Sequence, residues 1–474
     1  MTQLDAQKES ATRAGDVIIP RHRPDEPPEF PTPMTALTRP STKPRNQRCS
    51  VLAAAALQLL ALVGYTPVSG AATGADTVAE ANTAPAAVGT VVAVGGALRY
   101  DSAAVWSRLV ALAGGPGARY VVFGTASGDP ARAAERVVAA LEAHGARAEH
   151  LPVAPKLPGV DLEQAVRDPE LIARVSAARG VFFTGGAQER IVDTLQPGGH
   201  ATPLLDAIRN VFARGGVVAG TSAGAAVLGR VMFRDAPDLV TVMKGAVRPG
   251  QEVDRGLGLA PSNVFVDQHF LRRGRLGRML PLMQAQGLEL GIGVEENSAA
   301  ILRGHELEVV GNGGALLVDL AQATSDPGLG AFNVTGVRLT YLGDGDRFDL
   351  RTRALTPSAA KLQGTRIDPR AAGFEPSLEG TPFLLDVLGE GAILRGMSYV
   401  LDGPPAEVRG LAFDARPDAP APQQLGFEFR FHRGPDTTGW FTAASGEEAY
   451  TIANVRLDVM PVKVAQPLYR AWTP

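Results

Sequence analysis

The sequence predicts an α/β protein with a mostly parallel sheet flanked by helices, followed by a β-rich C-terminal region. Hydrophobic residues make up 45% of the 474 residues, which is enough to bury a sizeable core. From residue 88 to about 354, short apolar runs that end in glycine alternate with amphipathic segments. That alternation is typical of parallel strands joined by crossover helices. Beyond residue 355 the helical period gives way to a period of two, which indicates strands.

The first 87 residues read as three segments that precede the folded region. Residues 1–33 are polar and rich in proline, so we expect a disordered or mis-annotated extension, with Met34 as the true start. Residues 34–71 follow the order of a secretory signal peptide, in which a basic stretch precedes a short apolar run and small residues near Ala71. Residues 72–87 read as a linker. We therefore expect an exported protein, periplasmic or extracellular, with no membrane segment after cleavage, because the apolar run is too short to span a bilayer.

The predicted strands are uncharged runs rich in Val, Ile and Phe, and the predicted helices carry apolar residues at helical spacing. Strands are expected at 91–94, 120–123, 181–184, 217–219, 264–266 and 288–294. Hairpin strands are expected at 299–302, 307–310 and 315–319. Helices are expected at 102–113, 130–144, 204–213 and from about Arg272. Alternation at 427–431 and 455–464 predicts strands in the C-terminal appendage, 355–474.

Composition excludes several classes of function. The 46 basic residues are balanced by 49 acidic residues, to a net charge of −3, so no nucleic-acid partner is expected. One cysteine, Cys49, and seven histidines without metal-ligand spacing predict no metal site. Gly95-Gly96 is not part of a G-x-G-x-x-G motif, which excludes a dinucleotide-binding dehydrogenase. We expect no cofactor.

The segment Gly220-Thr221-Ser222-Ala223-Gly224 matches G-x-S-x-G directly after a predicted strand and before an apolar helix start. In that context the motif predicts a nucleophile elbow, with the serine at the apex of a sharp turn. The N–H groups that follow, beginning at Ala223, can bind an oxyanion. A tight strand-to-helix turn without chemistry is the alternative.

A serine nucleophile needs a base, and His269 is the best candidate because it lies at the C-terminal end of the strand at 264–266, where parallel sheets place catalytic groups. A satisfied structural histidine is the alternative. An acidic group must then orient the imidazole. Glu295, Glu296 and Asp267 all remain open on spacing alone. The order Ser, His, acid differs from that of α/β-hydrolases, which disfavours a lipase or esterase.

Several separate motifs over residues 88–354 resemble the cyanophycinase family of serine peptidases, which also contains aspartyl dipeptidase. The segment 182–190 resembles an FFTGG-D-Q motif, 220–225 a GTSAGA motif, 267–278 a DQHF-RGR-GR motif, and 291–296 a GIGIDE motif. Ala187 departs from the pattern, because the family usually has Asp there.

The resemblance implies a glutamine-amidotransferase-like fold and a catalytic set of Ser222, His269 and Glu296. It implies oxyanion donors at Gly186 and Ala223. The substrate-binding residues that it implies are Gln188, Asp267, Gln268, Arg273, Arg275 and Arg278. The spacing of Arg272, Arg275 and Arg278, with Arg273 beside them, predicts guanidinium groups on a helix start that face the site and bind carboxylates. An arginine-rich solvated helix face is the alternative.

The implied function is hydrolysis of cyanophycin, multi-L-arginyl-poly-L-aspartate, to β-Asp-Arg dipeptides through an acyl-enzyme. A dipeptidase or isoaspartyl peptidase on the same fold is the alternative enzyme, with a β-aspartyl peptide as substrate. A non-catalytic polymer-binding protein is a third hypothesis, against which the intact Ser222, His269 and Glu296 count. A homodimer remains open as the oligomeric state.

Overall fold

The computed structural model describes residues 89–416 and 424–472, with gaps at 445, 447, 466 and 470. All of them belong to one unit of the chain, Leu62–Pro474. The expected extension, signal peptide and linker (1–33, 34–71 and 72–87) lie outside the described residues. No helix in the described part is long and apolar enough to cross a membrane.

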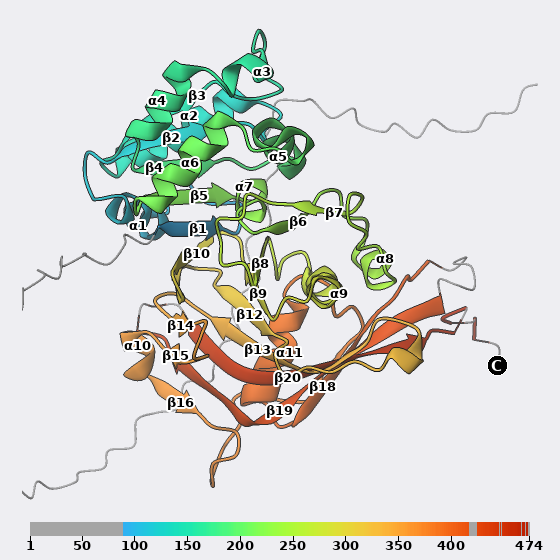
Figure 1. Ribbon diagram of the computed structural model, residues 1–474. Helices are drawn as coiled ribbons and strands as arrows, with labels where there is room; N and C mark the ends of the chain where they lie inside the picture. The colour runs from blue at the N-terminus through green and yellow to red at the C-terminus, as the bar shows by residue number, and fades with distance from the viewer. Residues whose placement is uncertain are drawn as a thin grey trace, which may run out of the picture. The chain divides into compact units, whose positions relative to one another are not determined.

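The first sheet combines a parallel half with an antiparallel half (Figure 1). The parallel strands are, in spatial order, β1 (Thr90–Val94), β5 (Val217–Thr221), β4 (Gly180–Phe183), β2 (Arg119–Phe123) and β3 (Arg147–Leu151). On the other side of β1 follow the antiparallel strands β10 (Ser298–Arg303), β11 (Glu306–Gly311), β14 (Arg347–Asp349) and β15 (Leu355–Thr356). The expected parallel sheet is therefore present, but it makes up only this half.

Helices cover both faces of the parallel half because its strands bury side chains on both sides. Along β1, Val91 and Ala93 join one core cluster, whereas Val92 and Val94 join another. The second of these faces packs against α1 (Ala103–Leu112) and α2 (Pro130–Ala143). The first face packs against α4 (Pro169–Ala177), α5 (Gln188–Leu195) and α6 (Pro203–Ala213).

Three of these helices have sequence signals that fix their first residue. Each of α2, α4 and α6 begins with proline at its first position, where the missing N–H costs nothing. The preceding residue, Asp129, Asp168 or Thr202, accepts a hydrogen bond from a backbone N–H of the first turn. The shorter helical segments in this half are α3 (Leu162–Ala165), α7 (Ala223–Ala226) and η1 (Pro197–Gly199).

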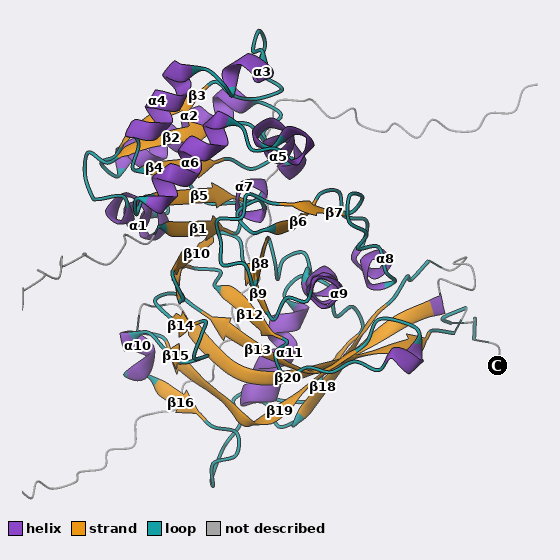
Figure 2. Ribbon diagram, viewed as in Figure 1, coloured by secondary structure: helices purple, strands orange, loops and turns teal. Residues whose placement is uncertain are grey.

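The second sheet is mostly antiparallel and draws strands from both sides of residue 354 (Figures 1 and 2). Its order is β17 (Phe383–Leu384), β18 (Glu407–Ala412), β19 (Leu425–Thr442), β20 (Ala449–Lys463), β13 (Val334–Leu342), β12 (Ala315–Asp319), β9 (Leu290–Val294) and β8 (Val264–Gln268), with β16 (Thr365–Ile367) also paired to β19. Within this second sheet, the described strands pair in parallel only at β8–β9 and β17–β18. The remaining elements are β6 (Val231–Phe233), β7 (Val253–Arg255), α8 (Leu239–Met243), α9 (Leu276–Gln286), α10 (Ala359–Leu362), α11 (Ala392–Asp402) and η2 (Pro327–Leu329).

The expected boundary at 354/355 is wrong as a domain boundary. The strand β20 pairs directly with β13, so residues beyond 355 continue a sheet that begins at β8. Phe427, Phe429 and Phe431 are fully buried in the same core cluster as Phe265 and Phe270. The period-two pattern correctly predicted these strands. It could not show their partners, because alternation fixes which face is buried and not which strand lies alongside.

A buried ion pair ties the same two regions together. The Asp346 carboxylate, before β14, accepts hydrogen bonds from Lys361 Nζ on α10 at 2.7 Å and from Thr451 Oγ1 on β20 at 2.6 Å. Both charged side chains are buried. The hairpin prediction needs a related correction: β10 and β11 pair as expected, but β12 pairs with β9 and β13 in the other sheet.

Removal of the C-terminal region tests this correction. A chain that ends at residue 354 is expected not to unfold cooperatively, because β13 loses its partner β20 and the second core loses Phe427, Phe429 and Phe431. Thermal unfolding followed by circular dichroism measures this. A matched truncation after residue 465 removes the exposed Leu468, Tyr469 and Trp472 and is expected to leave unfolding cooperative. If the chain that ends at residue 354 is soluble and unfolds cooperatively, residues 355–474 form a separate appendage, as the sequence analysis expected.

Candidate active site

Ser222 lies at the turn between β5 and α7, with φ of 53°, a conformation rare for residues other than glycine. Its own N–H donates to the carbonyl of Val94 at the end of β1, at 3.0 Å. The side chain is therefore held at the C-terminal edge of the parallel sheet by two neighbouring strands. Such local strain is typical of functional positions, and it agrees with the elbow predicted from G-x-S-x-G.

His269 directly follows β8 of the second sheet, also with positive φ, 47°. Its N–H donates to the carbonyl of Gly95 at 2.7 Å, which joins the end of β8 to the end of β1. Gly96 faces the imidazole so closely that a Cβ there would lie 2.2 Å from His269 Cε1, and its φ is +107°. Only glycine fits that position. The imidazole Nε2 lies 2.8 Å from Ser222 Oγ.

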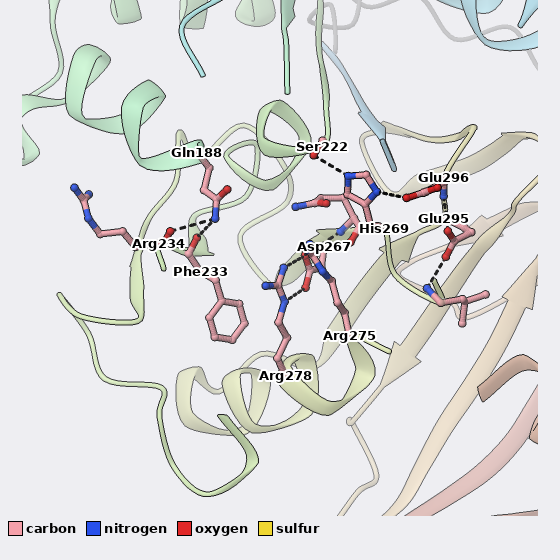
Figure 3. A network of polar contacts seen from close by, with 12 residues as sticks. Gln188, Ser222, Phe233, Arg234, Asp267, His269, Arg275, Arg278, Glu295 and Glu296 are labelled. Atoms are coloured by element: carbon pink, nitrogen blue, oxygen red, sulfur yellow. Dashed lines mark hydrogen bonds and ion pairs between the residues drawn. The ribbon is translucent and has the colours of Figure 1, made fainter. Parts of the chain in front are cut away.

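The two acidic residues after β9 have different partners, which resolves the choice left open by spacing (Figure 3). His269 Nδ1 lies 2.5 Å from Glu296 Oε1. Glu295 instead accepts backbone N–H groups of Leu271 at 2.5 Å, Arg272 at 2.9 Å and Glu296 at 2.7 Å. A carboxylate cannot donate, so Nδ1 carries the proton and Nε2 accepts one from the Ser222 hydroxyl.

Burial sets the protonation of this group. It lowers the pKa of His269 below its ordinary value of 6.5, while the hydrogen bond to Glu296 opposes that effect and the charge of Arg273 adds to it. The imidazole is therefore neutral near pH 7, as a general base must be. Burial also raises the pKa of Glu295, against the three N–H groups that stabilise its charge.

The backbone N–H groups of Gly186 and Ala223 have no acceptor among the described residues. Ala223 is the first residue of α7, so its N–H has no partner inside the helix. Gly186 follows Gly185, whose Cα lies against Ser222 closely enough that a Cβ would contact the serine Cβ at 3.1 Å. Ala223 is thus part of the elbow itself, whereas Gly186 is the residue after the glycine that packs against Ser222.

Asp267, Arg275 and Arg278 form a buried cluster, and this corrects the expectation that these arginines face a substrate. Arg278 Nε donates to the Asp267 carboxylate at 2.7 Å, and Arg275 Nη1 donates to it at 3.1 Å. The two arginines are only 9% and 7% exposed. Burial by itself would raise the pKa of Asp267, but the charges of Arg278 and Arg275 outweigh it and hold that pKa below its usual range. Each of these three charged groups therefore has its counter-charge inside the cluster.

The reason lies in the backbone. The helix expected from about Arg272 begins at Leu276. Gly274 has a φ of +56°, which a helix does not accommodate, so the arginines are not displayed on one helical face. Arg272 and Arg273 are exposed, and the Arg273 guanidinium has no hydrogen bond or ion pair to the described residues. Of the four arginines in 272–278, Arg273 is the one without a hydrogen bond or ion pair to the described residues.

The two predicted glutamines are differently engaged. Gln188, at the start of α5, uses its amide nitrogen to donate to the carbonyls of Phe233 at 2.8 Å and Arg234 at 3.2 Å (Figure 3). Gln268 is buried, and its Oε1 has no partner among the described residues. Ala187, the departure from the family pattern, occupies the N-cap of α5 and gives it no side-chain hydrogen bond.

A pocket of about 230 Å³ opens beside the serine and histidine. It contains Ser222 and His269 together with a wall of apolar and aromatic residues that sequence reasoning missed. That wall consists of Ala97, Leu98, Tyr100, Trp106 and Val137. No acidic side chain lines it. Gly95-Gly96 after the first strand was the available signal, because it marks the turn that carries Ala97 to Tyr100 past the site.

Within the described residues no group of three or more His, Cys, Asp or Glu side chains could hold a metal ion.

The buried cluster gives a stability prediction. Asp267→Asn is expected to lower the free energy of unfolding by about 3–5 kcal/mol, because it leaves two buried guanidinium groups without their counter-charge. Denaturant unfolding measures this. Arg273→Gln, at an exposed arginine three residues before the helix, is the control and is expected to change stability by less than about 0.5 kcal/mol. Equal, small effects of both substitutions would argue that Asp267 is open to ligand.

The model of peptidase family S51 matches residues 93–310. The chain is 34% identical over 260 residues to a cyanophycinase of Trichormus variabilis, which covers 53% of this chain and 81% of that protein. It is 32% identical over 273 residues to a cyanophycinase of Geminocystis herdmanii, which covers 56% of this chain and 94% of that protein.

Among solved structures, a peptidase from an acI-B1 Actinobacterium aligns with a TM-score of 0.38 and 21% identity, over 48% of this chain and 89% of that one. The two cyanophycinases match this chain over 81% and 94% of their own length, and the S51 model matches a range that includes Ser222, His269 and Glu296. The chain therefore belongs to peptidase family S51 and is a serine-type peptidase.

Proposed function

We propose that this peptidase hydrolyses cyanophycin to β-Asp-Arg dipeptides through an acyl-enzyme on Ser222. The observation that carries the proposal is the unbroken chain from Ser222 Oγ to His269 Nε2 at 2.8 Å and from His269 Nδ1 to Glu296 Oε1 at 2.5 Å. Relatives that match this chain over most of their own length are named cyanophycinases, which supports this substrate.

The roles follow from the geometry. The Ser222 hydroxyl attacks the peptide carbonyl while His269 Nε2 takes its proton, and Glu296 stabilises the imidazolium that results. His269 then gives the proton to the leaving amine, and the peptide C–N bond breaks. Water, activated by the same imidazole, hydrolyses the ester and restores the serine. The substrate and one water molecule balance these steps with the three side chains.

The carbonyl oxygen becomes an anion during the attack, and the unpartnered N–H groups of Gly186 and Ala223 are the donors available to it. One such donor contributes about 3 kcal/mol to a barrier. We propose Arg273 as the group that binds a substrate carboxylate, because its guanidinium is exposed and unpaired among the described residues. The oxygen of Gln268, buried without a donor, is proposed to accept one from the substrate.

An isoaspartyl peptidase is the alternative, and the small pocket beside Ser222 favours it. A volume of about 230 Å³ suits one side chain, and the aromatic and aliphatic lining, with no acid, suits an uncharged one. The two functions share the serine chemistry and differ in the substrate.

We also propose export of the protein, on the signal-like sequence at 34–71. An exported enzyme would degrade polymer released by other cells. N-terminal sequencing of the protein recovered from outside the cytoplasm tests this proposal, and a mature N-terminus near residue 72 is expected.

The Ser222→Ala variant tests the proposed function. Incubation of the parent protein with insoluble cyanophycin is expected to clear the suspension and release β-Asp-Arg, identified by mass spectrometry. The variant is expected to lose activity by a factor on the order of 10⁶, because no nucleophile remains. Cleavage of small isoaspartyl peptides without clearing would move the assignment to the alternative. No serine-dependent cleavage of either would overturn both.

The pH profile tests His269 as the base. Because burial lowers its pKa, kcat/KM is expected to fall on the acid side with a midpoint below 6.5. Arg273→Gln removes a positive charge that disfavours the imidazolium, so the midpoint is expected to rise by about 0.3 pH units. Arg147→Gln, an exposed arginine on the edge strand β3, is the matched control and should leave it unchanged. An unmoved or lower midpoint in Arg273→Gln would contradict this assignment.

A further inference from the structure

The loop before α11 contacts the turn that carries the candidate base. Gly391 N–H donates to the carbonyl of Leu271 at 3.2 Å. Leu388 packs so tightly on the same turn that a Cβ at Gly274 would lie 1.9 Å from its carbonyl oxygen. The loop belongs to residues 385–391, well beyond the region that matches the S51 model. Part of the active-site surroundings is therefore supplied by the C-terminal region.

Two side chains extend this backbone contact to the site itself. Arg272 Nη1 lies 2.8 Å from Glu390 Oε1 on the loop. The same guanidinium places Nε 3.6 Å from Glu296 Oε2. Glu296 thus divides its carboxylate between two donors, with Oε1 on His269 Nδ1 and Oε2 toward Arg272. Charge alternates from Glu390 through Arg272 to Glu296, which in turn accepts the hydrogen bond of His269.

We propose that Glu390 and Arg272 are positioning residues for the proposed serine chemistry, in which Glu390 fixes the Arg272 guanidinium and Arg272 holds the outer oxygen of Glu296. The inner oxygen of Glu296 then stays on His269. The inference rests on the proposed function, because it assumes that His269 acts as the base for Ser222. It adds two residues that neither the motifs nor the conventional triad include, one of them outside the S51 match.

Stability is not what this pair contributes. The Arg272 and Glu390 side chains are 49% and 64% exposed, and an exposed pair of this kind adds little to the free energy of folding. Their effect is on the charge that Glu296 and His269 experience. The other charged groups facing these two residues are Glu295, Arg273 and Arg275. Removing either member of the pair changes that balance, and the two removals do so in opposite directions.

The test measures how fast a fluorophosphonate labels Ser222 across pH, because labelling reports the activated serine without any assumption about the natural substrate. Arg272→Gln removes a cation next to Glu296, so the imidazolium is favoured and the midpoint of the labelling profile is expected to rise. Glu390→Gln leaves Arg272 uncompensated, so the midpoint is expected to fall. Each shift is expected to be about 0.3 pH units, with a 2- to 5-fold change in labelling rate near the midpoint, about what an exposed pair supports.

Three variants distinguish this role from a purely structural ion pair that joins the loop to the turn. Arg272→Lys keeps the charge and is expected to retain the parent midpoint. The exchanged double variant, Arg272→Glu with Glu390→Arg, restores an ion pair but puts a carboxylate beside Glu296, so it is expected not to restore the rate. Glu149→Gln, which removes an exposed partner of Arg174 at the far edge strand, is the matched control and should move nothing.

The outcomes distinguish the two proposals. Absence of labelling in the parent protein would overturn the serine chemistry and this inference with it. Labelling of the parent with the same midpoint in Arg272→Gln and Glu390→Gln would overturn the inference alone. Full rescue by the exchanged double variant would assign the pair to a structural clip. Opposite shifts, in variants whose unfolding temperatures match that of the parent, would support it.

Discussion

The active site depends on a close approach of two backbones at Gly95 and Gly96. There the end of β1 meets the end of β8 through the hydrogen bond from His269 N–H to the Gly95 carbonyl. The Ser222 N–H also donates a hydrogen bond to the carbonyl of Val94, the last residue of β1. The end of this one strand therefore positions both the serine and the histidine. The absence of a side chain at Gly96 leaves room for the imidazole. Without that approach, residues on two different sheets would not come within hydrogen-bonding distance.

Local signals predicted the parallel half of the fold well, and pairing between distant segments is where prediction failed. Buried runs such as 91–94 and 217–219 identify their own strands, and proline at 130 and 203 marks helix starts. The edge strand β3 was missed because its sequence, RAEHL, is charged and half exposed. The C-terminal strands were expected from alternation, but their sheet was not, since β20 finds its partner β13 more than a hundred residues earlier.

The same distinction separates the site residues that local sequence predicted from those that only the fold reveals. A motif places Ser222, and strand position favours His269, so both were accessible from sequence. Spacing could not separate Glu295 from Glu296, because adjacent residues at a turn point in directions that only the fold decides. The arginines misled for a similar reason: their regular spacing indicated one helical face, whereas Gly274 interrupts the helix and turns Arg275 inward to Asp267.

Two neighbouring carboxylates acquire opposite tasks from their surroundings. Glu295 is surrounded by three backbone N–H groups, so its hydrogen bonds hold the turn from Leu271 to Arg272 in place and leave no acceptor for the imidazole. Glu296 receives no such backbone donors from the described residues and directs one oxygen to His269. The first carboxylate therefore fixes where the chain runs after His269, and the second acts on the imidazole itself. Arg272 belongs to that same turn, so Glu295 also fixes the backbone from which the Arg272 side chain reaches Glu296. The conformation of the turn therefore affects the charge next to Glu296.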